Sequence, residues 1–205
     1  MNHKIHYHIL AGVMFLFFII GVSAVHAGVF FGFNGGYYLA SGWSDTHDLI
    51  YGGDGNYCLG LEAGYAFHFP LEVSLNASFI SKNGNRVWPD GNGGWESTGE
   101  SITYDMMPIN LIARWRFIRE GIFSPYVGAG LGYVQFDETG ESTKNGEGFL
   151  LVGGGDFFVH QWMKLFVELE WASYADVIGN AGASRYFGEG DLSGLSARTG
   201  VRFTF

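Results

Sequence analysis

The amino-acid sequence predicts an all-β protein, an eight-stranded antiparallel transmembrane up-and-down β-barrel preceded by a cleavable signal peptide. The first observation behind this prediction is an apolar run near the N-terminus that ends at small residues. The second is an apolar–polar alternation with a period of two, sustained over segments of about ten residues, the length that a tilted strand needs to cross a bilayer. The third is composition: of 205 residues, 18% are aromatic and only 15% are charged, whereas a soluble domain usually has about 25% charged residues.

Residues 1–27 have the three-part pattern of a secretory signal peptide. A short polar start precedes a run of 17 mostly apolar residues, and Val25-His26-Ala27 then offers small residues at the two positions that signal peptidase reads. An uncleaved membrane anchor is the alternative, although the run is short for a spanning helix, which needs about 20 residues. We therefore predict cleavage after Ala27 and an outer-membrane β-barrel domain over residues 28–205.

Eight segments that follow the signal peptide alternate between apolar and polar residues. In the last of them Leu195, Val201 and Phe203 alternate with Ser196 and Arg202, so that one face of the strand is apolar and the other is polar. The expected strands cover residues 28–40, 56–67, 71–81, 101–117, 124–136, 147–159, 162–175 and 191–205.

The connections between these strands alternate in length. Those after the second, fourth and sixth strands are short, whereas the others are long and rich in Gly, Asn, Asp and Ser; the long ones cover residues 41–55, 82–100, 137–146 and 176–190. Short turns at one end and long loops at the other are typical of a membrane barrel, and the barrel must close because unpaired backbone groups are costly in hydrocarbon. A soluble eight-stranded barrel of the lipocalin type, with the apolar face inside, is the alternative.

Three segments resemble the small outer-membrane barrel superfamily of Gram-negative bacteria, which includes the OmpA-like and OmpX-like domains and the opacity proteins. They are PYVGAGLGY from Pro125 to Tyr133, GVRFTF from Gly200 to Phe205, and MPINL from Met107 to Leu111. The resemblance implies location in the bacterial cell outer membrane, in contact with its lipid and lipopolysaccharide. It also implies that the barrel assembly machinery reads the terminal Phe205, and that the protein serves envelope integrity or surface interaction and adhesion.

The polar faces of the strands carry charges that we expect inside the barrel. Strands seven and eight form a hairpin, which places Glu168 opposite Arg198, and strands three and four place Glu72 near Arg114 or Arg116. Such a set can be a structural plug of paired charges, because unpaired buried charges are costly, or it can be an ion-gating network. The expected luminal charge network consists of Glu62, Glu72, Arg114, Arg116, Asp156, Lys164, Glu168, Glu170, Arg198 and Arg202.

The long loops contain aromatic residues among Gly and Asn. Exposed aromatic rings beside adaptable polar residues are typical of a recognition surface, whereas rings at the loop ends can also belong to the interfacial girdle of a barrel. The loop interaction candidates are Trp43, Tyr51, Trp88, Trp95, Tyr186 and Phe187. We predict that the ligand of this surface is a host or surface molecule, whose identity the sequence leaves open.

Two loops repeat the pattern Asp-Gly-Asn, at residues 54–56 and 90–92. Carboxylate and amide oxygens can coordinate Ca²⁺, but Asp-Gly is also ordinary turn chemistry and the full spacing of a calcium loop is missing. We therefore expect no metal and no cofactor.

Other functional classes are disfavoured by composition. A net charge of −9 argues against a nucleic-acid partner, and the single cysteine rules out an intramolecular disulfide. Only His47, His68 and His160 follow the signal peptide, and no motif of a lipid A deacylase or a barrel protease accompanies them, so we expect no enzyme. The sequence favours a barrel with a mostly side-chain-filled lumen that acts in envelope integrity or surface interaction; a narrow porin-like channel for small solutes is the alternative.

Overall fold

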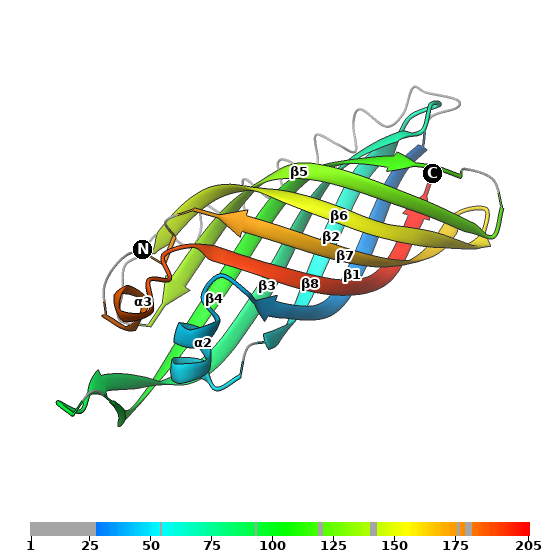
Figure 1. Ribbon diagram of the computed structural model, residues 1–205. Coiled ribbons are helices and arrows are strands. Elements are labelled where there is room, and N and C mark those ends of the chain that lie inside the picture. Colours follow the sequence, from blue (N-terminus) through cyan, green and yellow to red (C-terminus); the bar gives the residue numbers. More distant parts are fainter. Residues whose placement is uncertain are drawn as a thin grey trace, which may run out of the picture.

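The protein is a closed antiparallel β-barrel in a computed structural model that describes residues 28–53, 55–92, 94–118, 121–139, 143–175, 177–178 and 182–205 (Figure 1). The signal peptide predicted for residues 1–27 lies outside the described residues. The eight strands of the described part are β1 (Gly28–Ala40), β2 (Gly55–Ala66), β3 (Leu71–Pro89), β4 (Trp95–Arg116), β5 (Phe123–Glu138), β6 (Lys144–His160), β7 (Met163–Tyr174) and β8 (Leu192–Thr204). Helix α2 (Ser44–Tyr51) lies between β1 and β2, and α3 (Gly182–Phe187) lies between β7 and β8.

Each strand pairs with its neighbours in sequence, and β1 also pairs with β8, so the sheet closes without an edge. The closing register runs from Phe30 opposite Thr204 to Ala40 opposite Gly194. The predicted fold class is therefore confirmed. In the described residues, no helix has the length and apolar character needed to cross a bilayer.

The main difference from the sequence prediction lies in the connection between β3 and β4. Residues 82–100 were expected to form a loop, but most of them continue both strands as a long hairpin that projects beyond the rest of the sheet (Figure 1). The ribbon lacks a strong apolar alternation because it projects beyond the rest of the sheet and most of its side chains reach water. Polar pairs across the ladder hold it instead: the Thr103 hydroxyl donates to Asn83 at 2.7 Å, and Arg86 pairs with Glu100 at 3.1 Å.

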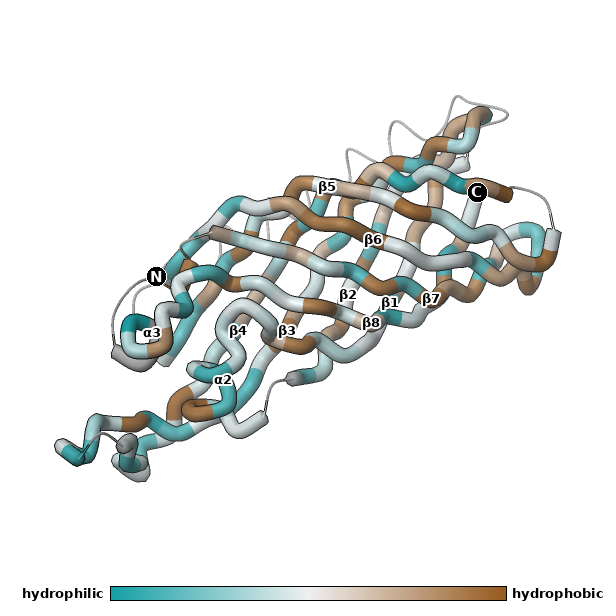
Figure 2. Tube along the Cα trace, in the orientation of Figure 1, coloured by the Kyte–Doolittle hydropathy of each residue, from teal (hydrophilic) through white to brown (hydrophobic). Residues whose placement is uncertain are grey.

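The two faces of the barrel wall carry opposite chemistry. Large apolar side chains such as Leu59, Leu131 and Leu169 are exposed on the outside, whereas Glu168 and Arg198 are buried inside. Figure 2 shows hydrophobic and hydrophilic residues following one another along the strands. This orientation excludes the lipocalin-type alternative, because a soluble barrel would bury its apolar face.

The two ends of the barrel also differ. Short connections at residues 67–70, 117–122 and 161–162 share one end with the start of β1 and the end of β8. At that end, aromatic rings pair around the rim, as in the stacking of Trp162 on Phe203 at 5.9 Å. The β3–β4 hairpin, α2 and α3 lie at the opposite end (Figure 1), which is the extracellular end of a barrel with this layout.

Candidate functional site

The inner half of the lumen, towards the short turns, is filled by a continuous chain of ion pairs. Four arginines and five carboxylates make up this chain, which we call the luminal ion-pair network. All nine side chains are buried. Its members are Glu62, Glu72, Arg114, Arg116, Asp156, Glu168, Glu170, Arg198 and Arg202.

The first part of the network joins β7, β8, β4 and β2. The Nη2 atom of Arg198 lies 2.5 Å from a Glu170 oxygen and 2.7 Å from a Glu168 oxygen. The other Glu168 oxygen accepts from Nε of Arg114 at 2.8 Å. Nη1 of Arg114 then reaches Glu62 at 2.6 Å. Because β4 and β7 are not neighbours in the sheet, the Arg114–Glu168 pair crosses the lumen.

The second part continues from β2 to the short-turn end. Arg202 bridges Glu62 at 2.8 Å and Asp156 at 2.5 Å. Arg116 then bridges Asp156 at 2.7 Å and Glu72 at 2.5 Å. Each arginine thus contacts at least two carboxylates among the described residues. A guanidinium suits this role because its donors form a rigid fork that can serve two acceptors.

Lys164, the tenth predicted luminal charge, lies apart from the network. Its side chain is half-buried near the short-turn end, and its ammonium lies 5.0 Å from the centre of the Phe158 ring. Of the ten predicted luminal charges, five are acidic and five basic, whereas the network joins the five carboxylates to four guanidiniums.

Aromatic side chains complete the network, and the sequence analysis missed them. The Tyr126 hydroxyl donates to Glu168 at 3.0 Å, and the Arg202 guanidinium lies 3.9 Å from the centre of the Phe166 ring. A side chain at Gly154 would collide with the Tyr126 hydroxyl, since an added Cβ would come within 2.9 Å of it. Tyr126 lies within the PYVGAGLGY segment. Its alternation with Val127, whose side chain faces outwards, could have identified it as a luminal residue.

The outer half of the lumen has a different lining, which is apolar and aromatic. We call this space the outer chamber. Its walls come from strands around the whole barrel and include Tyr38, Ile80, Tyr104, Met106, Val134, Phe136, Leu150, Tyr174 and Leu192. Helix α2 lies at the extracellular end of the barrel (Figure 1), and its residue Tyr51 belongs to the same buried cluster as the chamber walls.

Trp43 and Tyr51, two of the predicted loop interaction candidates, lie inside the outer chamber. Trp43 is only 1% exposed, and Tyr51 is also buried. The Trp43 ring lies 5.4 Å from that of Tyr104 and 5.8 Å from that of Phe136, and its indole N–H donates to the Tyr38 hydroxyl at 3.2 Å. For these two rings, the prediction of an exposed recognition surface and the alternative of an interfacial girdle were therefore both wrong. They turn inwards because the chamber offers apolar surface that would otherwise face water.

His47, expected in the first external loop, is also buried on α2. One of its ring nitrogens lies 3.2 Å from the Tyr104 hydroxyl, and its ring meets that of Trp43 edge-on at 4.7 Å. On the same helix, Tyr51 donates a hydrogen bond to Glu138. Burial and the neighbouring Glu138 carboxylate raise the pKa of Tyr51, which keeps its hydroxyl protonated as a donor.

The other four loop aromatics lie at the outer surface. Trp88 on the hairpin and Tyr186 on α3 are each 65% exposed. Trp95 and Phe187 are half-buried, because their rings meet Tyr186 at 5.5 Å and 5.0 Å. We call Trp95, Tyr186 and Phe187 the outer aromatic cluster. It joins the β3–β4 hairpin to α3, two segments far apart in sequence.

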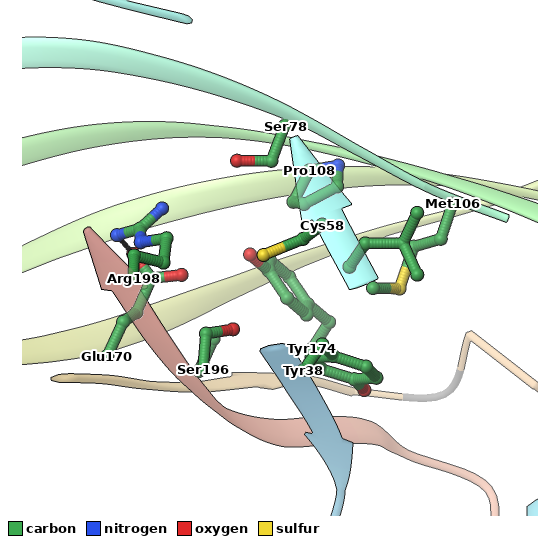
Figure 3. Close-up of a pocket in the computed structure, with 11 residues that line it drawn as sticks. Tyr38, Cys58, Ser78, Met106, Pro108, Glu170, Tyr174, Ser196 and Arg198 are labelled. Atoms are coloured by element: carbon green, nitrogen blue, oxygen red, sulfur yellow. Dashed lines mark hydrogen bonds and ion pairs between the residues drawn. The ribbon is translucent and has the colours of Figure 1, made fainter. Parts of the chain in front are cut away.

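A small cavity separates the outer chamber from the ion-pair network (Figure 3). Cys58, Tyr174, Glu170 and Arg198 line it together with seven other side chains. Its free space is enough for about one water molecule. The lumen between the two halves is therefore nearly filled.

The Asp-Gly-Asn pattern at residues 90–92 forms a turn. A carboxylate oxygen of Asp90 accepts from the backbone amides of Asn92 at 2.7 Å and Gly94 at 2.8 Å. These two bonds lower the pKa of Asp90. Asp54, in the other copy, lies outside the described residues. In the part of the chain that the structure describes, no three His, Cys, Asp or Glu side chains are grouped so as to hold a metal ion.

Phe205, the predicted assembly signal, lies exposed at the short-turn end. Its ring meets Phe31 edge-on at 6.4 Å, and its amide donates to Val29 at 2.9 Å. The last residue is thus held beside the first strand, where the barrel closes.

Comparison with known proteins agrees with this architecture. The family model described as Outer membrane protein beta-barrel domain matches residues 13–205, whereas no curated protein matches the sequence. Among solved structures, Neisserial surface protein A superposes with a TM-score of 0.60 at 15% identity, covering 86% of this chain and 97% of its own. A major outer membrane protein from Thermus thermophilus gives a TM-score of 0.52 at 15% identity, covering 88% and 100%. The N-terminal β-barrel domain of Pseudomonas aeruginosa OprF gives 0.50 at 14%, covering 87% and 97%. At these identities the structures establish the fold.

Proposed function

Because the chain belongs to the outer membrane protein β-barrel domain family and resides in the bacterial outer membrane, we propose that it is a closed, non-conducting barrel that acts through its extracellular surface. The apolar outer band contacts the lipid and lipopolysaccharide of that membrane. The loops at the opposite end from the short turns provide the interaction surface for a ligand outside the cell.

The main observation behind this proposal is that side chains fill both halves of the lumen. The luminal ion-pair network fills the inner half across non-neighbouring strands, and the packed rings of Trp43, Tyr104 and Phe136 fill the outer half. The free space between them admits about one water molecule. A solute would have to displace both fillings, which argues against the alternative of a narrow channel.

The surface at the extracellular end supports a role in binding. The β3–β4 hairpin extends past the rim of the barrel, exposes Trp88 and contributes Trp95 to the outer aromatic cluster. Exposed aromatic side chains on a defined scaffold are common anchors of recognition surfaces. Neisserial surface protein A, which has the same fold, is by its name a surface protein.

Two measurements test the proposal, one on the refolded protein and one on bacteria that carry it in the outer membrane. Planar-bilayer recordings are expected to show no steady single-channel steps, and regular steps would replace the proposal with the channel alternative. Binding of bacteria to matrix-coated plates is then compared between the wild type and a variant in which residues 86–100 are replaced by Asn-Gly. This two-residue turn suits the facing pair Asn85 and Ser101.

The truncated hairpin is expected to reduce binding while leaving the barrel folded. The matched control is Asn92→Ser, which changes the hairpin tip without shortening it. Equal binding by all three proteins would mean that the hairpin is not part of the interaction surface. Heat-modifiable gel mobility verifies that each barrel has folded.

A further inference from the structure

Helix α2 is held at the extracellular end of the barrel by side chains from three separate segments of the chain. The Glu189 carboxylate accepts from the backbone amides of Asp45 at 3.1 Å and Thr46 at 2.8 Å. Glu138 of β5 accepts from Tyr51. Lys82 of β3 provides the third tie, at the C-terminal end of the helix.

These ties match the polarity of the helix. The ammonium of Lys82 donates to the backbone carbonyls of Gly52, Gly53 and Gly55 at 3.1, 2.7 and 2.9 Å. A carboxylate therefore meets the N-terminus of α2, and a cation meets the carbonyls beyond its C-terminus, as the helix dipole favours. Both ties are wholly or partly exposed to solvent, so each is expected to be weak and sensitive to salt.

The chain after α2 has the features of a hinge, whereas the chain before the helix is anchored to β8. Before the helix, the amides of Ser41 and Gly42 are anchored to the Ser193 carbonyl at 3.0 and 3.1 Å. After it, Gly52 and Gly53 have φ angles of 66° and 87° and are exposed, with open space around both α-carbons. Rotation at these glycines can move α2 without breaking the strand ladder.

The walls of the outer chamber belong to the strands and remain when α2 moves. Trp43 is then the occupant of a site built by Tyr38, Tyr104 and Phe136. This occupant shows what fits: a flat aromatic ring that packs edge-on against its neighbours and donates one hydrogen bond. Beneath it, the Glu170–Arg198 pair and the rest of the network close the way to the periplasm.

We propose that the outer chamber is a binding site for a small planar aromatic molecule with a hydrogen-bond donor, and that α2 is a lid whose Trp43 fills the site while no ligand is bound. The ligand enters from the extracellular side and leaves by the same way, because the luminal ion-pair network blocks passage. This inference goes beyond the proposed surface function and does not depend on the ligand of the hairpin.

Gly84 provides a way to open the lid selectively. It lies on β3 under α2, and an added Cβ would stand 2.4 Å from the Ile50 carbonyl oxygen and 2.5 Å from the Tyr51 ring. Its three nearest neighbours in that position all belong to α2. Gly84→Ala therefore destabilises the closed position of α2 and leaves the strand pairing intact. Gly153→Ala is the matched control, since its Cβ would meet nothing within 4 Å.

Cys58 reports whether the lid is open. It is the only cysteine of the chain, is buried, and lines the cavity below the outer chamber (Figure 3). The rate at which a small, charged methanethiosulfonate reagent modifies Cys58 is measured for the full chain in phospholipid vesicles. Overpacking against the lid is expected to raise this rate about ten-fold or more in Gly84→Ala, whereas Gly153→Ala should react as slowly as the wild type.

Indole is the ligand probe, because it reproduces the ring of Trp43. Added at millimolar concentration, it is expected to slow the modification of Cys58 in Gly84→Ala several-fold. A folded Gly84→Ala protein that reacts at the wild-type rate would overturn the lid, and faster modification without protection by indole would overturn the binding site. If Gly84→Ala fails to fold, Lys82→Met and Glu189→Gln each remove one tie without adding atoms, and the same two criteria apply.

Discussion

The pair of Arg198 and Glu170 allows the contribution of the luminal ion-pair network to be measured. Their closest atoms lie 2.5 Å apart, and both side chains are buried. In Arg198→Met, Glu170 loses this guanidinium and keeps the neutral amide of Asn110 at 3.4 Å. A carboxylate stranded in this way is expected to lower the free energy of unfolding by about 3–5 kcal/mol.

The reverse change is expected to cost less. In Glu170→Gln, Arg198 keeps Glu168 at 2.7 Å and the Asn76 side chain at 3.0 Å, so a loss of about 1–3 kcal/mol is expected. The double variant removes both charges together. Its loss should fall short of the sum of the single losses by about 1–3 kcal/mol.

Urea unfolding from phospholipid vesicles, followed by tryptophan fluorescence, measures these three differences. The control cycle uses Arg86→Met and Glu100→Gln, because in this hairpin pair at 3.1 Å the Arg86 side chain is 35% and the Glu100 side chain 61% exposed, so the two should couple by no more than about 1 kcal/mol. Strict additivity at Arg198 and Glu170 would refute the reasoning, since it would mean that the network charges are solvated independently and that the lumen is wet.

Four further predictions concern the N-terminus, the C-terminus, the lipid-facing wall and α2. N-terminal sequencing of the membrane-extracted protein should find Gly28 first, and retention of Met1 would contradict the signal peptide. Deleting Phe205 should reduce the yield of folded barrel in the outer membrane, because the barrel assembly machinery is expected to read this residue; normal yield and heat-modifiable mobility would disprove that role. Leu169→Arg places a cation on an outward-facing side chain that is 57% exposed and should cost about 2–4 kcal/mol in vesicle unfolding, whereas Asn92→Arg at the exposed hairpin tip should cost little; equal stabilities would contradict the assigned facing of β7. In hydrogen–deuterium exchange, the amides of α2 should exchange much faster than those of the inner half of β4, and equal protection would mean that the helix opens only when the barrel unfolds.

The strands and their facing could be predicted from the sequence because both follow from a local pattern. A period of two places Leu169 and Glu168 on opposite faces wherever the strand lies. The pairing of Glu168 with Arg198 also followed from symmetry, since both residues are equally distant from the centre of the connection between β7 and β8. The count of strands, their order and the chemistry of each face were therefore accessible.

The contents of the outer half of the lumen could not be predicted in this way. Trp43 and Tyr51 lie in a segment with the composition of a loop, and their burial depends on the volume that the strands leave unfilled. No local pattern encodes that volume. The extension of β3 and β4 was missed for a related reason: a ribbon that projects into water needs no apolar alternation, and its pairs, such as Thr103 with Asn83, are polar.

The two halves of the lumen differ in how firmly they are joined to the wall. In the inner half, Arg114 of β4 contacts Glu168 of β7, and Arg202 of β8 contacts Glu62 of β2, so ion pairs cross the barrel between strands that are not neighbours. Separating any of these strands would leave buried charges without their partners, which is costly. In the outer half, α2 is tied by the side chains of Lys82, Glu138 and Glu189, at least two of which stay in contact with water. Movement of α2 exposes the buried side chains of Trp43, His47 and Tyr51 but breaks no buried ion pair, so we expect it to cost less than separation of two strands. A conformational response of this protein is therefore expected at the extracellular end, while the inner half stays closed.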